Sequence, residues 1–254
     1  MQGLRDRVAV ITGAGSGIGL ASVRRLAAEG ARVVAVDVDE AAGKAAADEA
    51  GGLFVRADVS VEEDVRRIYA IAGEAYGGVD IAFNNAGISP ADDDSILSTD
   101  LDTWRRVQEV NLTSVFLCCK HAIEHMRPRG RGSVINTASF VAVMGSATSQ
   151  VSYTASKGGV LALSRELGVQ FAREGIRVNA LCPGPVNTPL LRELFASDPE
   201  RAARRLVHVP IGRFAEAAEI AAAVAFLASD DSSFITASCF LVDGGISAAY
   251  VTPL

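Results

Sequence analysis

A tyrosine and a lysine stand four residues apart, at Tyr153 and Lys157, in a stretch whose apolar spacing predicts a helix from Ser152 to Arg173. Residues at this spacing lie on one face of a helix, so both side chains would point the same way. A free phenol has a pKa of about 10 and is a poor base at neutral pH, but a nearby ammonium favours the phenolate and lowers that pKa. Such a tyrosine can exchange a proton with an alcohol. The spacing is common in helices, so it needs support from other signals.

A glycine-rich turn, Thr12–Gly19, lies near the N-terminus. It follows the β-branched run Val8–Thr12 and opens a predicted helix from Gly17 to about Glu29, so the context is strand, turn and helix. Glycines let the backbone turn tightly and approach a pyrophosphate, which then sits at the positive end of the helix. The turn predicts dinucleotide binding, and an ordinary glycine loop is the alternative.

The second predicted strand, Arg32–Asp37, ends in a carboxylate eighteen residues after Gly19. A carboxylate at that place accepts hydrogen bonds from the hydroxyls of the adenosine ribose. A 2′-phosphate would meet the negative charge of Asp37, and neither Ser16 nor Val38 supplies an arginine to hold it. We therefore predict NAD rather than NADP as the cofactor, with an exposed turn carboxylate as the alternative role of Asp37.

Short β-branched runs alternate with longer Ala-rich segments that carry apolar residues at helical spacing, which is typical of a parallel sheet covered by helices. Because the runs are nearly continuously apolar, both faces of the sheet should be buried. We expect an α/β fold: a single doubly wound Rossmann-type domain over residues 1–254, with roughly seven parallel strands. Beyond the two strands above, the predicted strands are Leu53–Asp58, Val79–Asn84, Ser133–Ala138, Arg177–Leu181 and Phe240–Asp243.

Two segments interrupt this alternation: Ser89–Asp102, which is acidic and contains proline, and Pro183–Phe214, which carries two turn signals. Both follow strands, where α/β proteins place ligand-binding loops. We expect a substrate lid at about residues 185–214. The basic cluster within it either meets an acidic carrier or forms a solvated helix face, and consists of Arg201, Arg204 and Arg205.

The charge balance of the 254 residues excludes several classes of function. The formal net charge is −6, and no basic stripe with interleaved aromatic residues is present, so we expect no nucleic-acid partner. No apolar run approaches the roughly 20 residues that cross a bilayer, and charged residues precede the first apolar stretch. We therefore expect no membrane partner and a cytoplasmic location.

The cysteines and histidines suggest neither a disulfide framework nor a metal site. The four cysteines show no disulfide or CxxC spacing, which suits a reducing compartment. The segment His121–His125 fits a zinc pattern of two histidines and a glutamate, but the chain holds only three histidines, and the third, His208, is remote in sequence. We expect no metal.

Taken together, these motifs make the chain resemble the short-chain dehydrogenase/reductase family over essentially its whole length. The resemblance looks strongest to the bacterial subgroup that includes 3-oxoacyl carrier-protein reductases and many alcohol dehydrogenases. Two positions depart from the family pattern: Ser139 lies fourteen residues before Tyr153 instead of the usual thirteen, and Ala237 stands where the subgroup commonly has glycine. The matching motifs are Thr12–Gly19, Asp58-Val59, Asn84–Gly87, Asn111, Ser139, Tyr153 with Lys157, Pro183-Gly184 followed by Thr188, and Val242–Gly245.

The resemblance implies roles for four catalytic residues. Tyr153 would donate and accept the proton, and Lys157 would bind the nicotinamide ribose and lower the pKa of that tyrosine. Ser139 would steady the substrate oxygen, and Asn111 would keep a water in a proton relay that starts at Lys157. The implied cofactor contacts are Gly13, Ser16, Gly17, Ile18, Gly19, Asp37, Asp58, Val59, Asn85, Ala86, Gly87, Tyr153, Lys157, Pro183, Gly184, Val186 and Thr188.

The sequence therefore predicts an NAD(H)-dependent oxidoreductase that transfers a hydride between nicotinamide and a secondary alcohol or ketone. Two alternatives stay open: a 3-oxoacyl-thioester reductase with carrier-protein or CoA substrates, and a non-catalytic NAD-binding sensor or scaffold. The resemblance also implies a homotetramer, formed through the helices that follow Asn111 and Tyr153 and through the C-terminal segment.

Overall fold

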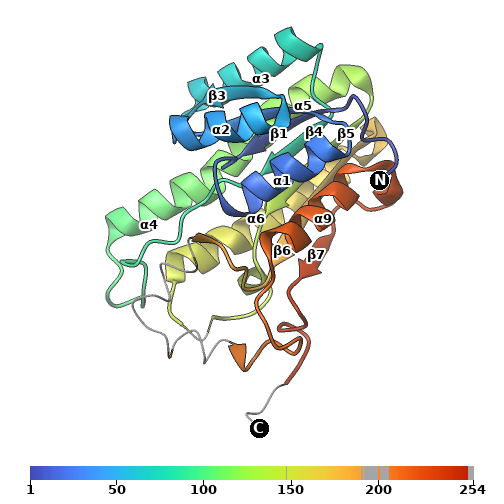
Figure 1. Cartoon of the computed structure of the whole chain (residues 1–254). Coiled ribbons are helices and arrows are strands. Elements are labelled where there is room, and N and C mark those ends of the chain that lie inside the picture. The colour runs from blue at the N-terminus through green and yellow to red at the C-terminus, as the bar shows by residue number, and fades with distance from the viewer. Residues whose placement is uncertain (147, 190, 192–199, 201–205, 251–254) are drawn as a thin grey trace.

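A computed structural model describes residues 1–146, 148–189, 191, 200 and 206–250. Its centre is a seven-stranded sheet in the order β3-β2-β1-β4-β5-β6-β7, in which every neighbouring pair is parallel (Figure 1). This confirms the predicted doubly wound α/β sheet. The strands are β1 Val8–Thr12, β2 Arg32–Asp37, β3 Leu53–Arg56, β4 Ile81–Asn84, β5 Gly132–Thr137, β6 Ile176–Pro183 and β7 Cys239–Val242.

Strand bounds agree with the sequence prediction to within two residues. The run expected to continue to Asp58 ends at Arg56, because Asp58 closes a turn in which its carboxylate accepts from the N–H (2.9 Å) and hydroxyl (2.6 Å) of Ser60. The strand expected to begin at Val79 begins at Ile81. These differences leave the order and direction of the strands as predicted.

Helices cover both faces of the sheet, and β1 shows why. Successive strand residues point to opposite faces. Val8 and Val10 join one core cluster, whereas Ala9 and Ile11 join the other. Helices α1 (Gly17–Ala28), α2 (Glu40–Ala50) and α9 (Ala217–Ala228) contribute to the second cluster, and α3 (Glu62–Tyr76), α5 (Ser114–Met126) and α6 (Val151–Gln170) contribute to the first (Figure 1).

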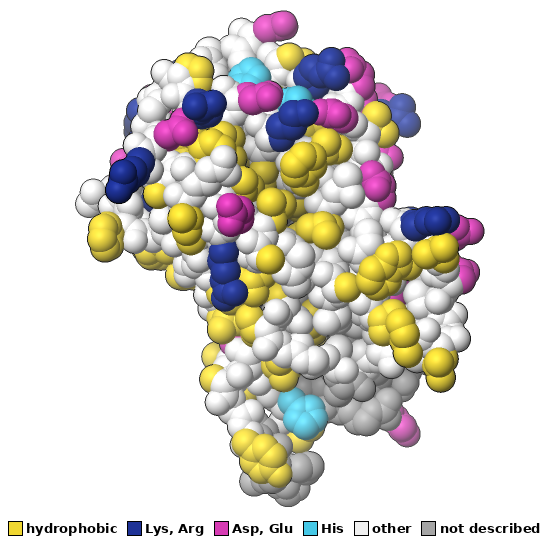
Figure 2. Space-filling view, turned by 180° about the vertical axis from the view of Figure 1, so that it is seen from behind, with side chains coloured by type: hydrophobic (Ala, Val, Ile, Leu, Met, Phe, Trp, Pro, Cys, Tyr) yellow, Lys and Arg dark blue, Asp and Glu magenta, His cyan; other side chains and the backbone are white. Residues whose placement is uncertain are grey.

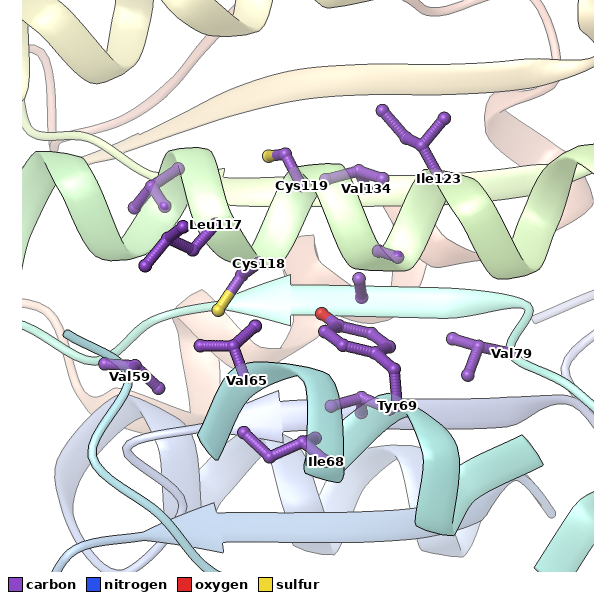
Figure 3. Close-up of a cluster of buried hydrophobic side chains, with 14 of the residues drawn as sticks. Val59, Val65, Ile68, Tyr69, Val79, Leu117, Cys118, Cys119, Ile123 and Val134 are labelled. Carbon is purple, nitrogen blue, oxygen red and sulfur yellow. The ribbon is translucent and has the colours of Figure 1, made fainter. Parts of the chain in front are cut away.

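The first cluster lies between the sheet and helices α3, α5 and α6, and Figure 3 shows the part of it near α3 and α5. Tyr69 of α3 is fully buried there, near Cys118 of α5. All four cysteines carry free thiols, in keeping with the absence of a disulfide spacing. No described helix is long and apolar enough to cross a membrane.

Ala237, where the family pattern has glycine, lies at a position whose backbone conformation favours glycine. Ala237 adopts a φ of +56°, in the left-handed region that glycine reaches more easily than other residues. Its N–H donates to the carbonyl of Val178 in β6 (2.8 Å), which fixes the turn just before β7. The glycine that the resemblance implies at this position would adopt this backbone conformation without strain.

The two irregular segments follow β4 and β6, as predicted. Residues 89–100 contain no helix or strand and lead into α4 (Leu101–Gln108). Much of the expected lid, including Arg201, Arg204 and Arg205, lies outside the described residues.

Candidate active site

The glycine-rich turn joins the end of β1 to the start of α1, where the backbone needs residues without side chains. Gly13 and Gly17 have φ values of +64° and +52°. A Cβ on Gly13 would lie 3.0 Å from the Cα of Ala86, and a Cβ on Gly19 would collide with the carbonyl of Gly13. Ser16 occupies the N-cap position of α1, and its side chain makes no capping hydrogen bond. The N–H groups of the first turn of α1 therefore stay available for phosphate oxygens. The turn therefore fits a dinucleotide.

The segment after β4 is tied to this turn. The Asn85 side chain donates to the carbonyls of Thr12 (3.1 Å) and Gly13 (3.4 Å). In return, the hydroxyl of Thr12 accepts from the N–H groups of Asn85 (3.0 Å) and Ala86 (3.1 Å). The structure thus brings Asn85 and Ala86 to the predicted cofactor turn, and the Asn85 side-chain amide stabilises the turn through its carbonyls.

The carboxylate of Asp37 lies across the turn at the end of β2. One oxygen accepts from the N–H of Gly15 (2.8 Å) and the other from that of Asp39 (3.0 Å). A Cβ on Gly15 would lie only 3.0 Å from the first oxygen. The structure therefore places the Asp37 carboxylate directly against the glycine-rich turn.

Two further predicted cofactor contacts, Asp58 and Val59, lie in the turn after β3. Val59 is buried in the first core cluster. The N–H of Asp58 donates to Asp64 (2.8 Å), and both hydrogen bonds from Ser60 go to one oxygen of the Asp58 carboxylate. The second oxygen of this exposed carboxylate is therefore what Asp58 can offer a cofactor.

Tyr153 and Lys157 lie one turn apart on α6, as the spacing predicts. The Lys157 ammonium is 5.5 Å from the centre of the Tyr153 ring and donates to the carbonyl of Thr137 at the end of β5 (2.8 Å). Lys157 is almost completely buried, and this burial lowers its pKa to about 8. The cation is thus fixed beside the phenol.

Asn111 lies in a π-helical turn, Glu109–Thr113, between α4 and α5. Its carboxamide oxygen accepts from the N–H of Ile88 (2.8 Å), and its NH₂ donates to the carbonyl of Ile88 (2.8 Å) and to the hydroxyl of Ser156 (3.3 Å). A Cβ on Gly87 would lie 3.2 Å from that oxygen and 3.4 Å from the Lys157 ammonium. The structure therefore brings Asn111, Gly87 and Lys157 together. The sequence predicted a helix around Asn111, and the structure adds the π turn, a feature common at functional sites.

Ser139 and Tyr153 face one pocket. Ser139 follows β5 and occupies the N-cap position of a short 3₁₀ helix, Phe140–Ala142. Among the described residues that line the pocket, none carries a charge at neutral pH. They are Ile18, Ser89, Thr137, Ala138, Ser139, Phe140, Gln150, Tyr153, Pro183, Gly184, Pro185, Val186, Thr188 and Leu191. Two of the four predicted catalytic residues, Ser139 and Tyr153, therefore share one pocket with the predicted contacts around Pro183–Thr188.

Asp93 also reaches this region, and the sequence analysis did not identify it. Its carboxylate accepts from the N–H groups of Ser152 (2.9 Å) and Tyr153 (2.8 Å). The acidic composition of its segment was the only sequence signal, because the partners lie about sixty residues away in the chain.

His121, the first histidine of the pattern on α5, contacts two carboxylates. His121 Nδ1 lies 2.9 Å from a carboxylate oxygen of Glu124, and its Nε2 lies 3.4 Å from one of Glu62. Within the described part of the chain, no group of three or more His, Cys, Asp or Glu side chains is arranged to hold a metal ion.

The chain is similar to known proteins over almost its whole length. A family model described as "Enoyl-(Acyl carrier protein) reductase" matches residues 13–247. The chain is 44% identical to cis-4-hydroxycyclohexanecarboxylate dehydrogenase of Sinomonas cyclohexanicum, covering 96% of this chain and 97% of that protein. It is 40% identical to 2,5-dichloro-2,5-cyclohexadiene-1,4-diol dehydrogenase of Sphingobium indicum, covering 98% and 100%. The crystal structure of levodione reductase superimposes with a TM-score of 0.90 at 41% identity, covering 97% and 99%.

Proposed function

The chain belongs to the short-chain dehydrogenase/reductase family, and we propose that it is an NAD(H)-dependent dehydrogenase that interconverts a ring-bearing secondary alcohol and its ketone. The family assignment makes the chain an oxidoreductase that acts on CH–OH groups or ketones with a nicotinamide cofactor. The choice of NAD, the substrate class and the role of each residue are the content of the proposal.

The observation that carries the proposal is the pocket shared by Ser139 and Tyr153, with the Lys157 ammonium 5.5 Å from the tyrosine ring. The bound nicotinamide supplies or accepts the hydride. During oxidation, the Tyr153 phenolate accepts the proton of the alcohol, and during reduction the phenol returns it to the oxygen. The nearby cation favours the phenolate. With a pKa of about 8, Lys157 itself is mostly protonated at neutral pH.

Ser139 and Asn111 would assist at either end of this proton path. The Ser139 hydroxyl would donate to the substrate oxygen, where negative charge develops during ketone reduction. Asn111 would hold a water next to Lys157. A proton passed along this relay through Lys157 would replace the proton that Tyr153 gives to the substrate oxygen. Because Ile88 holds the amide of Asn111 on both sides, the group is fixed in place before substrate arrives.

The cofactor would lie along the carboxyl ends of the strands. The turn from Gly13 to Gly19 would hold the pyrophosphate, and Asp37 would bind the adenosine ribose. The family resemblance implies that Gly87 lies behind the adenosine ribose, but a Cβ on Gly87 would lie 3.4 Å from the Lys157 ammonium. We therefore assign Gly87, together with Thr188, to the nicotinamide end. Asp37 supports NAD over NADP, because its fixed negative charge opposes a 2′-phosphate.

Two observations support a compact, ring-bearing substrate. The described lining of the pocket carries no charge at neutral pH, which suits a neutral reacting group, and two relatives are named for substrates with six-membered carbon rings. The acyl-carrier-protein wording of the family model favours a second candidate, reduction of a 3-oxoacyl thioester. Substrate comparison separates the two.

We further propose that the protein assembles as a homotetramer. Phe116 of α5 is exposed and borders a groove that Leu167 of α6 also lines, and Val169 of α6 is exposed as well. Hydrophobic side chains are plainly visible between charged ones on the face opposite to that of Figure 1 (Figure 2). Light scattering tests this assembly, and a monomeric mass would contradict it.

The decisive experiment compares initial rates for cyclohexanol and an acyclic secondary alcohol with NAD⁺, and for acetoacetyl-CoA with NADH. We expect Tyr153→Phe to lower kcat by roughly 10²-fold or more while the Kd for NADH stays within about twofold. The matched control is Tyr76→Phe on α3, which removes the same hydroxyl outside the site. Substantial turnover by Tyr153→Phe would refute the assignment, and NADH binding without turnover of any substrate would favour the sensor alternative.

A further inference from the structure

We propose that Asp93 is a positioning residue that fixes Tyr153 by capping the catalytic helix α6 from the acidic segment after β4. The inference rests on the proposed role of Tyr153 and deepens it. It assigns the segment of residues 89–100 a second task besides lining the pocket through Ser89.

Helix α6 begins without a cap of its own. Gln150 occupies the N-cap position and makes no side-chain hydrogen bond to the helix. The first N–H groups of a helix have no partner inside the helix and need one from outside. Asp93 supplies it, with one carboxylate oxygen 2.9 Å from the N–H of Ser152 and the other 2.8 Å from that of Tyr153.

These contacts are strong because of charge and burial. Asp93 is 5% exposed, and hydrogen bonds to an ionised acceptor are about twice as strong as those between neutral groups. The negative carboxylate also lies at the positive end of the helix, which stabilises both. Removing it would leave two N–H groups in a poorly solvated place.

The three consecutive aspartates of the segment hold different partners. Asp92 accepts from the hydroxyl of Thr103 (2.9 Å) and pairs with Arg106 (2.8 Å), both on α4. Asp93 holds α6. The Asp94 carbonyl accepts from the N–H of Val151 (3.2 Å), while the Asp94 side chain is exposed. The segment is thereby held against both α4 and α6.

The position of Tyr153 follows from this arrangement. Tyr153 is the third residue of α6, so its backbone depends on the first turn, whereas Lys157 lies one turn further and is held by Thr137. Loss of Asp93 would loosen the phenol and leave the lysine in place. We therefore expect a defect in proton transfer with little change in cofactor affinity.

The test compares Asp93→Ala and Asp93→Asn with the matched control Asp94→Asn, whose side chain is exposed. Turnover is expressed per NADH-binding site, so that loss of folded protein does not count. A displacement of about 1 Å in a reacting group can lower the rate roughly 100-fold, and we expect a loss of 10- to 100-fold for Asp93→Ala. Asp93→Asn keeps one acceptor oxygen and should fall between it and the wild type, and Asp94→Asn should stay within about twofold. The Kd for NADH should change by less than about twofold in all three.

Hydrogen exchange measures the capping directly. The amides of Ser152 and Tyr153 should exchange faster in both Asp93 variants than in the wild type, and at the wild-type rate in Asp94→Asn. Unchanged exchange, or wild-type turnover per site in Asp93→Ala, would overturn the inference. If Asp93→Ala does not fold, Asp93→Asn answers both questions. If the wild type itself turns over no substrate, the proposed function has failed, and exchange at Tyr153 still decides whether Asp93 caps the helix.

Discussion

Replacing Asp37 should abolish most of the cofactor preference of the enzyme, and Coulomb's law gives the size of the effect. Hydrogen bonds from Gly15 (2.8 Å) and Asp39 (3.0 Å) hold the carboxylate in place, so it cannot swing away without losing both. A 2′-phosphate carries a charge of about −1.5 to −2. At roughly 5 Å and an effective dielectric constant of about 40 for this half-buried site, the repulsion is about 2–3 kcal/mol. That energy corresponds to a discrimination of about 100-fold against NADPH.

The assay is the ratio of kcat/KM with NADH to that with NADPH, measured on one ketone substrate. We expect a ratio of roughly 100 or more for the wild type, and a fall of about the same factor in Asp37→Ala, arising mainly from improved use of NADPH. The charge-matched control is Glu40→Gln at the exposed start of α2, which should change the ratio less than about threefold, because solvent screens a more distant charge. A wild-type preference for NADPH, or an unchanged ratio in Asp37→Ala, would refute the reasoning.

Two further predictions concern stability. Ala237→Gly relieves about 1–2 kcal/mol of left-handed strain at φ +56° against about 0.5–1 kcal/mol of added chain entropy. Calorimetry should therefore show a Tm about 2 °C higher, and a lower Tm would contradict the strain argument. Asp80 is buried and bound by the N–H of Val8 and by Arg129 and Arg131. Burial alone would raise the pKa of Asp80, but these partners outweigh it and hold the pKa below its usual value. The contribution of ionised Asp80 to the free energy of unfolding is therefore complete above about pH 4. It disappears as the pH falls through the lower pKa that Asp80 has in the folded protein. Asp80→Asn should cost about 2–3 kcal/mol at neutral pH, and denaturant titrations should show a shallower loss of stability in acid than for the wild type. Equal acid slopes would show that Asp80 is not responsible.

Much of the fold could be predicted because it is written in local patterns. Each strand is a short apolar run, and β1 and β2 were predicted with the bounds that the structure has. The pairing of Tyr153 with Lys157 was predictable for the same reason, since four residues make about one helical turn. The glycine turn needed only its context between a strand and a helix.

What escaped prediction depends on contacts between distant segments. Asp93 and the amides that it caps belong to separate segments, and nothing in composition links them. No sequence pattern distinguishes Asp80 near the start of a strand, but in the structure it pairs with Arg129 and Arg131, which follow α5. The π turn around Asn111 was hidden as well, because an apolar period of 3.6 does not reveal one additional residue.

That additional residue changes the rotational phase of the long helical segment from Leu101 to Met126. An α-helix turns about 100° per residue, so α4 and α5 present their faces about 100° out of step with an uninterrupted helix. On α4, Arg106 can therefore pair with Asp92 in the segment after β4, and Gln108 can donate to the carbonyl of Ser152 in α6. On α5, Cys118 stays in the core. Changes in sequence on the α4 side are thereby separated from the packing of the sheet. Substitutions that alter the contacts of α4 with the segment after β4 and with α6 can therefore leave the packing of α5 against the sheet undisturbed.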